Sequence, residues 1–115
     1  MYDIKRRTYL YALDVIAFLE NLPKDYITQT LGKQLLRSAT SVGANVIEAQ
    51  GSGSKKDFTN FYSYALKSAN ESKFWLGLLR DSGKISNEGV RLLIDEVKEL
   101  ANIIASCILT LKGKR

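Results

Sequence analysis

The sequence contains no histidine and only one cysteine, Cys107, among its 115 residues. Within such a chain, a Cys-His nucleophile and a zinc site of cysteine and histidine ligands cannot form, and one cysteine cannot close an intramolecular disulfide. We therefore expect no metal site, no cofactor and no disulfide framework. A chain without disulfides suits a reducing compartment, so the cytoplasm is the expected location.

Long apolar runs are also absent. The longest, residues 101–111, is interrupted by Asn102 and Ser106. It is far shorter than the roughly 20 residues that are needed to cross a bilayer. Near the N-terminus, Asp14 interrupts an apolar run and no small-residue cleavage site follows. These features predict a soluble protein with no signal peptide and no membrane partner.

Helix-breaking residues are few and fall in three places, at Pro23, in the cluster Gly51–Ser54 and over residues 81–87. The four long segments between them have apolar residues at helical spacing and lack the alternation of a strand. The predicted helices of this single domain, residues 1–115, cover about residues 3–21, 25–50, 54–81 and 87–112. Because short connections make neighbouring helices antiparallel, the expected fold is an all-α, antiparallel up-and-down four-helix bundle.

Helical spacing also predicts which side chains form the core. The first helix is expected to turn Leu10, Leu13, Ile16 and Ala17 inward. The third is expected to bury Phe58, Phe61, Ala65, Ala69, Ser72, Leu76 and Leu79, with Tyr62, Tyr64 and Trp75 left for a subunit interface. The fourth has a coiled-coil-like seam of Val90, Leu93, Val97, Leu100, Ile104, Cys107 and Leu111. Ser54 is the expected N-cap of the third helix.

A polar stripe runs along the second helix among small residues. At about 100° per residue it comprises Gln34, Arg37, Ser41, Asn45 and Glu48. One interpretation is an ordinary solvated helix face. The other is a buried or interfacial seam that fixes helix register or assembly, in which Glu71 of the third helix would be the partner of Arg37.

The run QLLRSATSVGANVIEAQGSGSKKDFTNFYSYALKSANES, residues 34–72, resembles the signature of a bacterial family of four-helix bundle proteins first noticed in intervening sequences of large-subunit ribosomal RNA genes. Their relatives include the accessory variability determinant of diversity-generating retroelements. The matching positions are Gln34, Leu35, Arg37, Ser41, Val42, Asn45, Val46, Glu48, Ser54, Asp57, Phe58, Ala65, Ser68 and Glu71. The chain departs from the pattern at Ser38, Ala49 and Ser52, where the family usually has alanine, glycine and arginine.

This resemblance implies a homo-oligomer, by analogy a pentameric ring, with no known catalytic activity. It also implies a reverse transcriptase and nucleic acid as partners, because a positively charged ring works with both in the retroelement relatives. Ser52 stands where an arginine is common in the turn of the family, so the resemblance gives little reason to expect that this turn binds anions.

The formal charge of +5 is concentrated at one end of the predicted bundle. In an up-and-down bundle the start of the first helix, the second turn and the end of the fourth helix share a pole. That pole collects eight basic residues, Lys5, Arg6, Arg7, Lys55, Lys56, Lys112, Lys114 and Arg115. They are candidates for RNA or DNA phosphate contacts of low sequence specificity. The alternative is a merely solvated pole that keeps the protein soluble.

No residue pattern indicates catalysis. The chain has no histidine, no phosphate-binding loop and no helical Glu-x-x-His pair, so we expect no catalytic residues and no enzyme. Two functional hypotheses remain. The first is an oligomeric accessory protein whose basic pole binds nucleic acid or a polymerase, and the second is a scaffold that binds only proteins.

Overall fold

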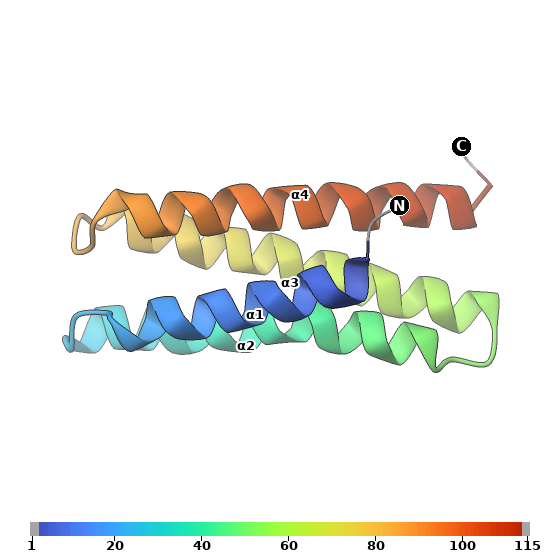
Figure 1. The fold of residues 1–115 in the computed structure, drawn as a ribbon, viewed down its shortest axis with the longest axis horizontal. Helices are drawn as coiled ribbons and strands as arrows, with labels where there is room; N and C mark the ends of the chain where they lie inside the picture. The colour runs from blue at the N-terminus through green and yellow to red at the C-terminus, as the bar shows by residue number, and fades with distance from the viewer. Residues whose placement is uncertain (1–2, 114–115) are drawn as a thin grey trace.

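The computed structural model describes residues 3–113, apart from the side chain of Asn87. It contains four helices, α1 (Ile4–Glu20), α2 (Tyr26–Gln50), α3 (Lys55–Asp81) and α4 (Asn87–Leu111). Successive helices run in opposite directions along the long axis (Figure 1). No strand occurs within the described residues, so the predicted all-α class with four helices is confirmed.

Three of the four helices begin at a side chain that caps free amides. The first amides of a helix have no partner inside it, and an acidic or hydroxyl side chain just before the helix can accept from them. Asp3 accepts from the Arg6 amide at 3.0 Å, and Asp25 accepts from the Thr28 amide at 2.9 Å. The predicted N-cap Ser54 is confirmed, because its hydroxyl accepts from the Asp57 amide at 3.1 Å.

The four helices surround one core, and each helix packs on two neighbours. α1 packs on α2 and α4, α3 packs on the same two helices, and the α2–α3 contact is the most extensive. The largest fully buried side chains include Leu35, Leu76, Leu100 and Ile104, at least one from each of α2, α3 and α4. The bundle measures 45 × 23 × 20 Å.

The predicted inward face of α1 is wrong. The buried residues are Thr8, Tyr11 and Val15, whereas Leu10, Leu13 and Ile16 are 40–45% exposed and Ala17 is exposed. Thr8 can be buried because its hydroxyl donates to the Lys5 carbonyl at 3.1 Å. The inward face of α1 is therefore partly polar, and an apolar stripe remains on its outer face.

Two glycines of α2 fix how α1 is rotated about its own axis and its level, meaning its position along the bundle axis. A methyl group at Gly43 would lie 3.1 Å from the Thr8 hydroxyl oxygen, and one at Gly32 would lie 3.1 Å from a Leu19 methyl carbon. Only glycine allows these close approaches without displacing the neighbour. Thr8 is therefore level with Gly43, and Leu19 is level with Gly32.

Two further expectations of core packing need correction. Tyr62, which was predicted to lie at a subunit interface, is only 4% exposed and stacks on Phe58 with ring centroids 4.7 Å apart. Cys107 and Leu111 end the predicted α4 seam but are only half-buried. The reason is length, because α1 has 17 residues and α4 has 25, so α1 does not cover the end of α4.

Candidate functional site

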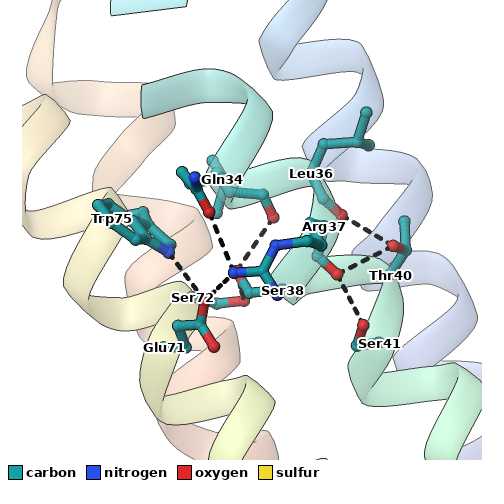
Figure 2. Close-up of polar contacts among 10 residues, drawn as sticks. Gln34, Leu36, Arg37, Ser38, Thr40, Ser41, Glu71, Ser72 and Trp75 are labelled. Carbon is teal, nitrogen blue, oxygen red and sulfur yellow. Dashed lines mark hydrogen bonds and ion pairs between the residues drawn. The ribbon is translucent and has the colours of Figure 1, made fainter. Parts of the chain in front are cut away.

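The polar stripe of α2 makes one contact with the next helix. Arg37 donates through one nitrogen to the Glu71 carboxylate on α3 at 2.7 Å and to the Gln34 side-chain oxygen at 3.0 Å (Figure 2). The Trp75 indole donates to the same Glu71 oxygen at 3.3 Å. The Arg37–Glu71 ion pair expected from the sequence is thus present and links α2 to α3.

The rest of the stripe does not join this cluster. The Ser41 hydroxyl donates to the Arg37 carbonyl at 2.8 Å, and the Asn45 amide donates to the Ser41 carbonyl at 2.8 Å. The Glu48 side chain is exposed, and its carboxylate forms no hydrogen bond or ion pair with a described residue. The Arg37 side chain is 64% exposed. In the single chain the stripe is therefore a surface feature, although its hydroxyl and amide groups are tied to the helix backbone.

Sequence reasoning missed a buried polar contact beside the stripe. The Ser72 hydroxyl of α3 donates to the Ser38 hydroxyl of α2 at 3.1 Å, and Ser38 donates to the Leu35 carbonyl at 3.2 Å (Figure 2). Both serines are at most 1% exposed. The sequence feature that could have revealed this contact is the position of Ser38, one helical turn from Leu35 and from Val42 on the inward face of α2. This contact fixes the register of α2 against α3 in the core.

The Tyr11 hydroxyl is also buried near Ser72 and completes no hydrogen bond of normal geometry. Burial raises the pKa of the Tyr11 phenol, and the nearby Ser72 hydroxyl opposes that rise only in part. Tyr11 is neutral at physiological pH, as an ordinary phenol is, and the raised pKa does not alter this. Its hydroxyl is a buried polar group without full compensation, which costs stability.

The candidate basic residues gather near one end of the bundle. Lys55 and Lys56 begin α3 and Lys112 follows α4, at the end that carries the α2–α3 turn (Figure 1). Lys5 and Arg6 lie in the first turn of α1. These five side chains, called here the basic end, are exposed and form no ion pair with any described residue. Lys114 and Arg115, also predicted for this pole, lie outside the described residues.

The structure separates Arg7 from the basic end. Its guanidinium contacts Glu96 at 2.7 Å and Glu99 at 3.1 Å, both on α4. The hydrogen bonds that the guanidinium donates to these two carboxylates raise the pKa of Arg7. Arg7 thus links α1 to α4.

The start of α1 is also set back from the tip of the bundle. Topology predicts the correct end, but α1 is eight residues shorter than α4, which corresponds to about 12 Å of helix. Lys5 and Arg6 therefore lie on the side of the basic end, and Lys55, Lys56 and Lys112 lie at its tip.

The chemistry available at the basic end is permanent positive charge. Lysine and arginine side chains attract phosphate through charge and donated hydrogen bonds. Residues 3–113 contain no cluster of three or more histidine, cysteine, aspartate or glutamate side chains that could hold a metal ion. None of the described helices is long and apolar enough to span a bilayer.

Comparisons with known proteins agree with this geometry. The family model described as 23S rRNA-intervening sequence protein matches residues 2–106. The crystal structure of a protein of unknown function from the S23 ribosomal protein family of Bacteroides thetaiotaomicron is similar, with a TM-score of 0.84 and 32% sequence identity. The similarity covers 91% of this chain and 97% of that one. A search of curated proteins gave no match.

Proposed function

The chain belongs to the 23S rRNA-intervening sequence protein family, and from this premise we propose that it is a non-enzymatic accessory protein of the cytoplasm, assembled from several copies, that binds nucleic acid at its basic end. The observation that carries the proposal is the set of five exposed basic side chains without ion pairs. A reverse transcriptase as protein partner and a ring of five copies have only the resemblance behind them.

Phosphate contact is the mode of binding that the basic end favours. Each lysine or arginine that neutralises a phosphate releases counterions, so affinity falls steeply with salt. Neither a helix-turn-helix nor a zinc module is apparent, and the basic end offers lysines and an arginine without an aromatic platform for base stacking. The binding is therefore expected to depend on salt and to discriminate little between sequences.

Two matched variants test the basic end. Lys55→Gln/Lys56→Gln removes two charges at the tip, and Lys24→Gln/Lys33→Gln removes two exposed, unpaired charges near the other end. Fluorescence anisotropy with labelled RNA and DNA, at low and physiological salt, measures affinity. The tip variant should bind more weakly, with the salt slope reduced by about 2, whereas the control should bind as the wild type does. If the wild type binds no nucleic acid at low salt, the scaffold hypothesis replaces this proposal.

The outer face of α1 supports self-assembly. Four large apolar side chains on it, called here the α1 apolar stripe, remain 40–62% exposed: Tyr9, Leu10, Leu13 and Ile16. A contiguous apolar patch of this kind marks an interaction site more often than an ordinary surface. A second copy is the occupant that we propose.

Charges on α1 and α2 match in a way that suits such an assembly. From the level of the two helices, Arg6 lies within one turn of the level of Glu48, and Asp14 is level with Arg37. In a ring whose axis follows the helices, neighbouring copies keep the same level. Placing the α1 apolar stripe of one copy on the α2 polar stripe of the next would bring Arg6 near Glu48 and Asp14 near Arg37. This arrangement would give the α2 polar stripe its role in assembly.

A further inference from the structure

Three of the four side chains in the α1 apolar stripe point directly away from α4. At about 100° per residue, Tyr9, Leu13 and Ile16 lie within about 60° of one another. Arg7, whose guanidinium reaches α4, lies about 150° from their mean direction. Because α1 packs on α2 and α4, a side chain that points away from α4 stands on the side of the bundle that α1 forms with α2.

Two exposed apolar side chains of α2 extend this surface, Leu36 and Ile47. Both lie within about 60° of the two glycines that face α1, and on the opposite side of α2 from Ser38, which contacts α3. Tyr9 and Ile47 line one open hollow of about 340 Å³, so the two helices contribute to a common surface there. This surface is called here the α1/α2 apolar face and comprises Tyr9, Leu13, Ile16, Leu36 and Ile47.

The next side of the bundle carries the α2 polar stripe. The stripe lies about 170° from the two glycines that face α1, so it stands on the side that α2 forms with α3. Glu71 of α3 binds Arg37 there, and the Trp75 indole donates to the same carboxylate. Tyr64 and Leu78 lie seven residues before and after Glu71, which places them within about 20° of it on α3. This side is called here the α2/α3 mixed face and comprises the α2 polar stripe with Tyr64, Glu71, Trp75 and Leu78.

The α2/α3 mixed face offers aromatic surface on either side of a polar centre. Tyr64 is 52% exposed and Trp75 is half-buried, and the sequence predicts both rings for a subunit interface. The Arg37–Glu71 ion pair lies between their levels. Because these two charges already neutralise each other within the chain, a second copy can cover them without leaving either charge unpaired.

The apolar residues of the two faces occur at matching levels. The close approach of α1 to Gly43 and the buried serine contact between α2 and α3 fix the levels of these three helices. Counted along the antiparallel helices from these contacts, Ile16 of α1 is level with Trp75 of α3. Tyr9 lies within about one helical turn of the level of Tyr64. In a ring whose axis follows the helices, Ile16 of one copy would therefore meet Trp75 of the next, and Tyr9 would meet Tyr64.

We propose that the α1/α2 apolar face of one copy packs on the α2/α3 mixed face of the next, so that Trp75 is buried between copies. The inference rests on the proposed assembly and deepens it, because it names the residues of α3 that receive the neighbouring copy. One side of the bundle measures 45 × 20 Å. That is roughly 900 Å², enough for the ~800 Å² per partner that stable interfaces bury. The two faces share α2 and lie at about a right angle, so repeated docking closes a small ring, whereas docking through opposite sides would build an open chain.

Fluorescence tests the burial of Trp75. The emission of a tryptophan lies at longer wavelength in water than in an apolar setting, and Trp75 is the single tryptophan of the chain. We expect the wild-type emission to shift to longer wavelength as dilution lowers the native mass, which light scattering records alongside. Leu13→Asp should show the long-wavelength emission at every concentration. Leu109→Asp, an exposed leucine on the side of α4 away from both faces, should behave as the wild type does.

Disulfide cross-linking between two different chains tests which faces meet. In a Cys107→Ser background, a chain with Leu13→Cys is mixed with a chain with Ser41→Cys, a member of the α2 polar stripe within one turn of the level of Leu13. The mixture should form a cross-linked pair under oxidation, and neither chain alone should do so. Asn70→Cys replaces Ser41→Cys as the control, because Asn70 is exposed at the level of Leu13 but lies about 100° from Glu71 on α3.

The outcomes distinguish this inference from the proposed assembly. If the native mass falls on dilution and the Trp75 emission does not change, the copies assemble through another face of α3 or α4, and this inference is wrong. A cross-link of Leu13→Cys to itself would indicate that α1 packs on α1, which would also overturn it. If the wild type is a single chain at all concentrations, the proposed assembly falls and this inference falls with it, whereas nucleic-acid binding at the basic end is tested separately.

Discussion

A charge placed in the α1 apolar stripe should dissociate the assembly without unfolding the chain. Leu13 is 45% exposed in the single chain, so about half of its surface remains to be buried. Full burial of a leucine contributes about 1.5–3 kcal/mol, and the remaining half therefore contributes about 1 kcal/mol. Leu13→Asp removes this contribution and also places an unpaired carboxylate in the interface, which costs several kcal/mol more.

The expected weakening of each interface is therefore at least about 4 kcal/mol, or roughly a thousandfold in the dissociation constant. Native mass from light scattering, recorded over a range of protein concentrations, should fall to that of the single chain, 12.9 kDa. Circular dichroism should remain helical, because Leu13 is not part of the core. Leu109→Asp is the matched control, since Leu109 is 39% exposed on α4, away from the stripe. A Leu13→Asp variant with the native mass of the wild type would refute assembly through α1.

Three further predictions concern stability. Ser38→Ala should cost about 1–3 kcal/mol in urea unfolding because it leaves the buried Ser72 hydroxyl without an acceptor, whereas Ser72→Ala should cost less because Ser38 keeps its backbone partner; the reverse order would contradict this contact. Arg7→Gln should cost roughly 1 kcal/mol, less at high salt, whereas Lys5→Gln should change nothing, because Arg7 bridges α1 and α4 and the exposed Lys5 does not; equal melting temperatures for the two variants would exclude that link. Hydrogen bonds from the start of α2 lower the pKa of Asp25 from 3.8 to about 2. This carboxylate therefore stabilises the fold above about pH 4, and the contribution is lost as the pH falls toward 2. The melting-temperature difference between the wild type and Asp25→Asn should vanish over that range.

The four helices could be predicted from the sequence because their signals are local. Ser54 before an apolar-periodic segment is an N-cap whatever the rest of the chain does, and Pro23 ends a helix by its own geometry. The rotation of α1 could not be predicted in this way. Its sequence has apolar residues on more than half of its circumference, so periodicity alone does not choose between Leu13 and Tyr11. That choice depends on Gly43 and Gly32 of α2, which have no side chain and therefore let Thr8 and Leu19 of α1 approach closely.

The candidate site shows the same division. The Arg37–Glu71 ion pair could be predicted because residues 34 apart in sequence face each other across one tight turn. The ion pair between Arg7 and Glu96 could not be predicted, because the two residues are 89 apart in the sequence. Whether they meet depends on where α1 lies along α4, which the sequence does not show. Charge counts place basic residues at the correct end of the bundle, but they do not show which of those residues are already neutralised.

The position of α1 in the bundle relates assembly to nucleic-acid binding. α1 and α3 are diagonal in the bundle, because α1 packs only on α2 and α4. Lys55 and Lys56, at the start of α3, therefore lie away from the α1 apolar stripe. A neighbouring copy docked on α1 would leave these lysines open, and each copy would add them to a common surface. Phosphate contacts made by linked copies are intramolecular after the first, so affinity rises steeply with copy number. A dissociated Leu13→Asp variant with all its lysines intact should consequently bind a long duplex more weakly than the wild type, but a short duplex that a single copy can contact equally well. Equal affinity for the long duplex would mean that the copies act singly, and assembly would then need another purpose.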